Sequence, residues 1–116
     1  MAYNRANAPD PNFEHLGLLL KSSSGETMGG LWGRSAYEWL FVELLFVPET
    51  LRGAGVGTSL MRQAEQVARD RGCTGVWLDT FAFQALPFYQ GLGFSVFGEL
   101  KDHPRGISQY WLEKRL

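Results

Sequence analysis

The stretch FVPETLRGAGVG, residues 46–57, decides the fold of this chain. An apolar run ends at Pro48, and three alternating glycines then lead into a segment with helical periodicity. The first turn of a helix carries unpaired backbone N–H groups and the positive end of the helix dipole. Glycines allow a phosphate to approach those N–H groups without interference from side chains. The stretch therefore predicts a strand, an anion-binding loop and a helix, with Arg52 and Thr58 adding a charge and a hydroxyl.

Two other kinds of phosphate-binding loop compete with this interpretation. A dinucleotide fingerprint needs Gly-x-Gly-x-x-Gly or Ala; Gly53 and Gly55 fit its first two positions, but Thr58 occupies the third. Asp79 lies about where a ribose-binding acid would follow, so a nucleotide-binding fragment stays open as an alternative. The antiparallel strands expected before the loop and the short chain after Asp79 disfavour it. A Walker loop is excluded because the sequence has no Gly-Lys-Ser or Gly-Lys-Thr.

Hydrophobic periodicity on both sides of the loop predicts the other elements. Three strands before the loop, separated by short turns, favour an antiparallel meander. After the loop, apolar residues at helical spacing predict an amphipathic helix that ends before Gly72. The expected strands are residues 13–21, 28–34, 37–47, 76–78, 94–99 and 107–113, with a second, shorter helix at 82–91. The order β-β-β-α-β-α-β-β predicts an α+β fold with a mixed sheet, antiparallel at both ends and with a parallel, right-handed unit from 40 to 79.

Composition and charge are those of an ordinary globular protein. The 116 residues suffice for one domain, assigned to residues 13–116 after an irregular lead-in at 1–12. A net charge of −1 argues against nucleic-acid binding, for which a basic excess is usual. The single cysteine, Cys73, excludes an intrachain disulfide, and no apolar run approaches the roughly 18 residues of a membrane span, so we expect a soluble cytoplasmic protein. Aromatic residues reach 14%, and we expect the tryptophans to lie in the core or to line a pocket.

The loop resembles motif A of the GNAT acetyltransferases, usually written Gln/Arg-x-x-Gly-x-Gly/Ala, with Arg52, Gly55 and Gly57 at the defining positions. A second segment, ALPFYQGLGF at residues 85–94, resembles the family's A-x-x-x-Y-x-x-x-G-F landmark. The two motifs occur in the family's order, and the resemblance covers about residues 13–116. The chain resembles an N-terminally short member, because the family normally has another strand and one or two helices before the first strand predicted here.

The resemblance implies an acetyl-CoA-dependent N-acetyltransferase that transfers an acetyl group to a primary amine by direct attack in a ternary complex. It places the pyrophosphate of acetyl-CoA at the glycine loop and the thioester carbonyl at a backbone N–H near Phe46, where the sheet splays. Ala82 stands where many members carry an asparagine, so Gln84 is the expected replacement for that contact. The predicted carrier-binding residues are Leu45, Phe46, Val47, Arg52, Gly53, Ala54, Gly55, Val56, Gly57, Thr58 and Gln84.

Tyr89 and Glu43 are the candidate catalytic residues. Tyr89 matches the family tyrosine near the thioester sulfur and would act as general acid; the alternative is a core aromatic packed beside Phe88. Glu43 interrupts an apolar strand, where we expect its carboxylate to be partly desolvated and to act as the base, directly or through water. A solvent-facing or ion-paired glutamate is the alternative for Glu43. Asp79 could cap the following helix or orient a group in the cleft.

The two histidines, His15 and His103, lie far apart and lack the spacing of metal ligands, so no metal is expected. The sequence leaves the acceptor open among small-molecule and peptide amines. A catalytically weak or inactive CoA-binding module of the same fold stays open as the alternative to an enzyme, because the short N-terminal region and the absent asparagine could remove contacts.

The strand at 13–21 is expected at an edge of the sheet, because the lead-in contains Pro9 and Pro11, which cannot donate ladder hydrogen bonds. An unprotected edge invites pairing with another chain, so we expect a homodimer. The leucines expected to be exposed along this edge are Leu16, Leu18, Leu19 and Leu20.

Overall fold

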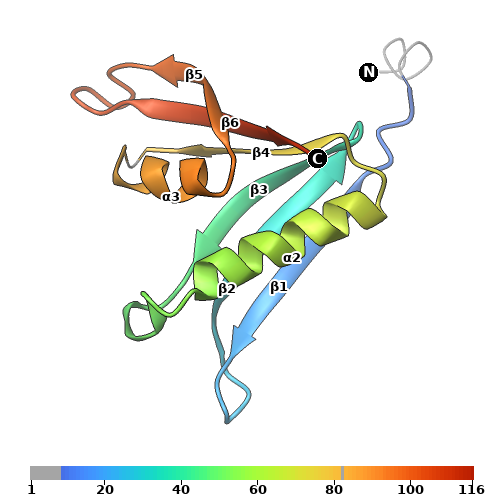
Figure 1. Ribbon diagram of the computed structural model, residues 1–116, viewed down its shortest axis with the longest axis vertical. Coiled ribbons are helices and arrows are strands. Elements are labelled where there is room, and N and C mark those ends of the chain that lie inside the picture. The colour runs from blue at the N-terminus through green and yellow to red at the C-terminus, as the bar shows by residue number, and fades with distance from the viewer. Residues whose placement is uncertain (1–8, 82) are drawn as a thin grey trace.

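Figure 1 shows the computed structural model, which describes residues 9–81 and 83–116. Its elements are β1 (Glu14–Lys21), β2 (Thr27–Ala36), β3 (Trp39–Phe46), η1 (Glu49–Leu51), α2 (Val56–Asp70), β4 (Gly75–Thr80), η2 (Phe83–Ala85), α3 (Leu86–Gly91), β5 (Ser95–Leu100) and β6 (Gln109–Arg115). Among these described residues, no helix is long and apolar enough to cross a membrane.

The strands form one sheet in the order β1-β2-β3-β4-β6-β5. Only β3 and β4 run parallel; every other neighbouring pair in the described sheet is antiparallel. The connection between β3 and β4 contains α2, as a parallel pair requires a long crossover. The predicted α+β fold, with a mixed sheet that is antiparallel at both ends, is therefore confirmed.

The second predicted helix is shorter than expected. The segment expected as one helix at 82–91 is described as the 3₁₀ turn η2 followed by α3, which begins at Leu86. Pro87 lies in the first turn of α3, where its missing N–H costs no helical hydrogen bond. Proline thus favours a helix start at this position, which the hydrophobic periodicity did not indicate.

One face of the sheet packs against α2, which passes in front of β1 and β2 in Figure 1 and also contacts β3 and β4. The buried residues of α2 recur at helical spacing and form one stripe along the helix. The core joins this stripe to the inward positions of the strands and to the segment after α3. Its buried members are Leu16, Leu31, Leu40, Val42, Leu60, Met61, Ala64, Ala68, Val76, Leu78, Leu92, Phe94 and Leu112.

The opposite face of the sheet carries all four tryptophans. Side chains alternate between the faces of a strand, and each tryptophan follows or precedes a buried residue that faces the core. All four are half-buried, so they do not belong to the fully buried core. The face away from α2 is therefore aromatic where a solvated sheet face is usually polar. These residues are Trp32, Trp39, Trp77 and Trp111.

Strand β1 lies at one edge of the sheet, as expected. Its predicted row of exposed leucines is wrong, because Leu16 is buried and Leu18 and Leu20 pack partly against the core. Only Leu19 of these four is exposed, at 47%. The reason is the two-residue alternation of the strand, which turns the even-numbered leucines toward the face that α2 covers.

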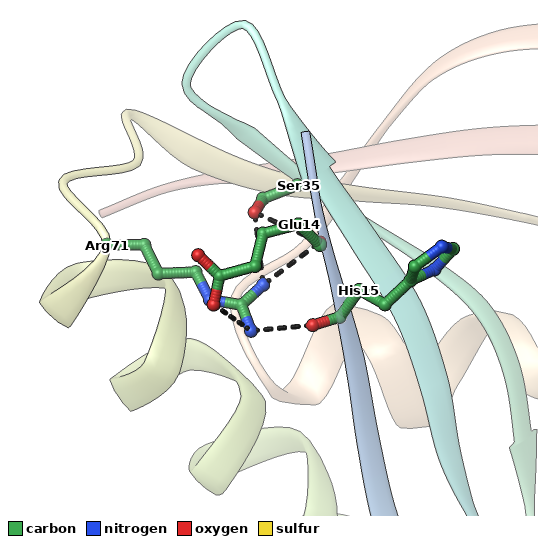
Figure 2. A network of polar contacts seen from close by, with 4 residues as sticks. All are labelled: Glu14, His15, Ser35 and Arg71. Atoms are coloured by element: carbon green, nitrogen blue, oxygen red, sulfur yellow. Dashed lines mark hydrogen bonds and ion pairs between the residues drawn. The ribbon is translucent and has the colours of Figure 1, made fainter. Parts of the chain in front are cut away.

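Arg71, directly after α2, fastens the end of that helix to β1 and β2 (Figure 2). Its guanidinium donates hydrogen bonds to the backbone oxygens of Glu14 (3.2 Å) and His15 (2.7 Å). It also donates to Ser35 Oγ at 3.0 Å and forms an ion pair with Glu14 Oε2 at 3.0 Å. One side chain thereby fixes the edge strand relative to the helix.

Candidate functional site

The segment between β3 and α2 is held in shape by local hydrogen bonds. The N–H of Leu51 donates to Pro48 O at 2.9 Å, and the N–H of Arg52 donates to Glu49 O at 3.2 Å. The Nε atom of Arg52 also donates to Val47 O at 3.0 Å. This bond places the guanidinium beside the end of β3 and next to the glycine loop.

Gly53 and Gly55 adopt positive φ angles of 81° and 79°, which side chains with a Cβ rarely adopt. A Cβ built on either glycine meets no atom within 4 Å, so the space in front of the loop is open. The first helical bond of α2 runs from the N–H of Ser59 to Gly55 O at 2.9 Å. The N–H groups of residues 56–58 precede that bond and lack partners within the helix. The loop thus presents backbone donors to an open space.

A cavity of about 810 Å³ lies against this loop. It is lined by Leu45, Phe46, Val47, Leu51, Arg52, Gly53, Gly55, Val56, Gly57, Thr58, Ala85, Phe88 and Tyr89. Nine of the eleven predicted carrier-binding residues therefore lie around one hollow, which we name the carrier cavity. Ala54 is exposed in the loop and does not line it. Position 82 and the side chain of Gln84 lie outside the described residues.

Tyr89, on α3, lines the carrier cavity. Its ring contacts Phe88 and Phe94 with edge-on geometry, at centroid distances of 5.0 and 6.0 Å. Burial raises the pKa of the Tyr89 hydroxyl above its ordinary value, because the phenolate would lose hydration. The residue therefore packs as an aromatic and also belongs to the lining of the carrier cavity, so the two interpretations from sequence are compatible.

Glu43 does not line the carrier cavity, and its predicted desolvation is wrong. The side chain is 40% exposed and forms an ion pair with Arg34 at 2.7 Å. The register of β2 and β3 shifts between Trp32 and Gly33, which leaves Glu43 as the extra residue of a β-bulge. Glu43 follows Phe41 by two residues along β3 and therefore lies, like Phe41, on the face opposite α2. Sequence reasoning missed Arg34, because its place beside Glu43 depends on a register that the sequence does not state.

Strands β3 and β4 diverge beside the carrier cavity. Their parallel register ends at Val42 and Leu78, whereas β3 continues to Phe46 (Figure 1). Beyond that point, β3 has no ladder partner on its β4 side among the described strands. The predicted splay near Phe46 is therefore present, and it frees backbone groups at the edge of the carrier cavity.

The other candidate residues lie apart from the carrier cavity. Asp79, on β4, is in register with Trp111 on the tryptophan face. His15 contacts the ring of Phe13, and His103 Nδ1 lies 2.7 Å from Gln109 Oε1. Within residues 9–81 and 83–116, no group of histidine, cysteine and acidic side chains is arranged to hold a metal ion.

The comparisons with known proteins agree with the loop and the fold. The model of the acetyltransferase (GNAT) family matches residues 2–94. The chain is 41% identical to the acetyltransferase Atu2258 of Agrobacterium fabrum over 99% of this chain and 84% of that protein. It is 43% identical to the blasticidin-S acetyltransferase of Streptomyces morookaense over 79% and 68% of the two chains.

Solved structures resemble the whole described fold. A crystal structure of an acetyltransferase from Agrobacterium tumefaciens has a TM-score of 0.94 at 41% identity, over 99% of this chain and 84% of that one. An aminoglycoside 6'-N-acetyltransferase complexed with coenzyme A shares the fold alone, with a TM-score of 0.77 at 17% identity over 88% and 73% of the chains. The glycine loop, the diverging strands and these similarities together show that the chain belongs to the acetyltransferase (GNAT) family.

Proposed function

We propose that this protein is an acetyl-CoA-dependent N-acetyltransferase that transfers the acetyl group to a primary amine by direct attack in a ternary complex. The observation that carries the proposal is the carrier cavity, whose lining contains the glycine loop, the splayed end of β3 and Tyr89. Each of these groups suits a different part of a thioester-bearing carrier. The solved neighbour complexed with coenzyme A supports the choice of carrier.

The glycine loop would bind the pyrophosphate of the carrier. The N–H groups of residues 56–58 and the positive end of α2 favour an anion in the open space before the loop. The guanidinium of Arg52 adds a positive charge beside them. The pantetheine arm would then run along the end of β3, where Leu45 and Val47 line the cavity.

The diverging strands and Tyr89 would assist the transfer itself. As the amine nitrogen attacks the carbonyl carbon, the carbonyl oxygen gains negative charge that a free backbone N–H near Phe46 can stabilise. The C–S bond then breaks, and the thiolate takes a proton from Tyr89 or from water. Glu43, directly or through water, accepts the proton that the attacking amine loses. The raised pKa of Tyr89 keeps its hydroxyl in the protonated form throughout the neutral range.

Thiol release from acetyl-CoA, measured across a panel of primary amines, tests the activity. The loop assignment is tested by Gly55→Asp, with Gly55→Asn as the matched control. Aspartate and asparagine have similar size, and both tolerate positive φ better than most other residues with a side chain. We expect acetyl-CoA to raise the melting temperature most in the parent, less in the Asn variant, whose side chain enters the same space, and not in the Asp variant, whose charge also repels pyrophosphate. Parent-like shifts in both variants would show that the pyrophosphate does not bind at this loop.

The same pair of measurements separates the enzyme from an inactive CoA-binding module. A melting shift with acetyl-CoA but no thiol release with any amine would identify such a module. A shift with NAD or ATP in place of acetyl-CoA would favour the nucleotide-binding alternative. Thiol release that depends on the amine is the outcome expected for the acetyltransferase.

Further features of the protein stay as proposals. The relative named as a blasticidin-S acetyltransferase supports a small-molecule amine as acceptor over a peptide amine.

We assign one domain to residues 13–116, because a single core joins β1 to β6. A second copy of this chain is the proposed protein partner. A cytoplasmic location stays a prediction that rests on the single cysteine, Cys73.

A further inference from the structure

Strand β3 connects the carrier cavity with a second hollow on the tryptophan face. This second hollow has a volume of about 460 Å³, within the range of small-molecule sites. We name it the aromatic cleft; it is lined by Arg34, Ala36, Tyr37, Trp39, Phe41, Trp77, Phe97 and Glu113. Along β3, Trp39 and Phe41 line the aromatic cleft, Glu43 follows, and residues 45 and 46 line the carrier cavity.

Arg34 links the aromatic cleft to Glu43. Its guanidinium carbon lies 5.0 Å from the centroid of the Phe41 ring, while its Nη1 atom lies 2.7 Å from the Glu43 carboxylate. The candidate base is therefore held at one end of the cleft by a residue that also lines it. An amine that reaches Glu43 would have its remaining atoms over the cleft.

The lining of the cleft is suited to a flat apolar group. Phe41 and Trp77 are stacked, with centroids 4.1 Å apart and ring planes inclined by 21°. The two charged residues, Arg34 on β2 and Glu113 on β6, lie on opposite sides of these rings, because β3 and β4 lie between their strands. A ligand that lies between the two charged residues contacts mainly aromatic carbon. Such a lining favours a ligand with an aromatic ring of its own, which can make stacked or edge-on contacts.

The spacing along β3 sets the length of such a ligand. Phe41 and Glu43 are two residues apart, and a strand rises by about 3.4 Å per residue, so a ring over Phe41 and the Glu43 side chain would be separated by roughly 7 Å. An ethyl or propyl linker bridges this separation when the hydrogen bond of about 2.8 Å between the ammonium group and the carboxylate is included.

We propose that the aromatic cleft is the acceptor subsite and that the acceptor is a primary amine joined to an aromatic ring by a short alkyl linker. The ring packs in the aromatic cleft while the amine lies at Glu43, facing the thioester across the gap between β3 and β4. This inference rests on the proposed acetyltransferase activity for its catalytic readout, but the binding of the ring can be measured without it.

A pair of probe amines tests the preference for a flat ring. 2-Phenylethylamine and 2-cyclohexylethylamine have the same carbon skeleton, but only the first has a planar aromatic ring. We expect kcat/KM for thiol release to be about 3- to 10-fold higher for 2-phenylethylamine, the range that aromatic contacts provide beyond buried area. Equal values for the two amines, in an enzyme that acetylates both, would overturn the proposal and leave the proposed activity intact.

Two substitutions locate the preference in the cleft. Phe97→Leu removes a ring that lines the cleft, and Phe13→Leu is its control, because Phe13 lies outside the cleft and is similarly exposed, at 52% against 56%. Trp77→Leu removes the central stacked ring. We expect the ratio of kcat/KM for the two amines to fall toward one in Trp77→Leu, to fall in Phe97→Leu and to keep its parent value in Phe13→Leu. A fall of the same size in Phe13→Leu would overturn the assignment.

Binding without turnover separates this proposal from the proposed function. Tryptophan fluorescence is titrated with 2-phenylethylamine and, as control, with 2-cyclohexylethylamine, in the absence of acetyl-CoA. Tighter binding of the aromatic amine, lost in Trp77→Leu, supports the cleft even if no amine releases thiol. No binding of either amine, together with a sedimentation mass that falls in Trp77→Leu, would show that a second copy of the chain covers this face and would overturn the proposal.

Discussion

Tyr89 combines two features in one side chain, because its ring packs against Phe94 and the residue also lines the carrier cavity. Tyr89→Phe retains the ring and removes the proton donor. We expect turnover to fall on the order of 10²–10⁴-fold, with acetyl-CoA affinity nearly unchanged. Single-turnover acetyl transfer, with a thermal shift as the binding control, measures both quantities. Parent-like turnover would leave Tyr89 as a packing residue.

The raised pKa of Tyr89 also predicts a pH dependence of stability. The folded protein holds this proton more tightly than the unfolded chain, whose tyrosines titrate near pH 10. The stability linked to Tyr89 is therefore complete below about pH 10 and is lost as the pH rises through the folded value. Urea unfolding above pH 9 should show a steeper alkaline loss for the parent than for Tyr89→Phe. Identical slopes would contradict the buried hydroxyl.

Glu65 and Lys114 form an ion pair in the protein interior, with Lys114 Nζ 2.6 Å from Glu65 Oε1. The Glu65 side chain is only 2% exposed, and its Oε2 atom has no hydrogen-bond partner among the described residues. Lys114→Met would leave the buried carboxylate with only the more distant Arg69, 3.9 Å from Glu65 Oε1, and we expect a cost of about 3–5 kcal/mol. Chemical denaturation measures this loss.

The double variant Glu65→Leu/Lys114→Met is the control for that pair. It removes both charges, so we expect it to regain most of the stability that Lys114→Met alone loses. A double variant as unstable as the single one would show that packing of the lysine stem, and not the unpaired charge, dominates the loss.

At the scale of elements, the hydrogen bonds of Arg71 attach the end of α2 to β1, the edge strand of the sheet (Figure 2). Arg71→Met removes donors to two backbone oxygens of β1 while keeping much of the apolar stem. We expect a loss of about 2–4 kcal/mol, since hydrogen bonds that involve charged groups contribute more than neutral ones. Amide exchange in β1 should accelerate most.

Arg62→Met is the matched control, because Arg62 lies on the exposed side of the same helix. Substitutions at such surface positions usually change stability by no more than about 0.5 kcal/mol. Similar losses of stability in the two variants, or unchanged amide exchange in β1 of Arg71→Met, would show that Arg71 does not hold β1 against α2.

At the scale of the whole molecule, β1 leaves one edge of the sheet open to another chain. Its sequence, EHLGLLLK, has Glu14 at one end and Lys21 at the other. Two copies that pair antiparallel through β1 would place each Glu14 near the other copy's Lys21, so the edge is complementary to itself. The predicted homodimer therefore joins two sheets edge to edge and leaves the aromatic cleft accessible.

Sedimentation equilibrium at micromolar concentration tests the dimer. We expect a mass twice the 13.0 kDa of one chain, and a shift toward 13.0 kDa in Leu19→Lys, which adds a charge to the exposed position of the edge. Ile107→Lys is the control at a similarly exposed leucine-sized residue away from β1. A parent that sediments as a single 13.0 kDa species would exclude the dimer.

Apart from the place of Tyr89, which the family resemblance implied, the sequence alone determined the order of the elements and the glycine loop. These features depend on contacts between residues close in the chain: the periodicity of a helix, the stop at Pro48 and the positive φ angles that glycine permits. The family landmarks coincide with the same local features, which is why they could be recognised without coordinates.

Only the tertiary structure decided which distant side chains meet. The ion pair of Glu43 with Arg34, the ion pair of Glu65 with Lys114 and the gathering of the tryptophans on one face all depend on strand register and helix packing. A shift of one residue in register moves every side chain of a strand to the other face. Local sequence does not state that register, because it is fixed by the packing of residues far apart in the chain.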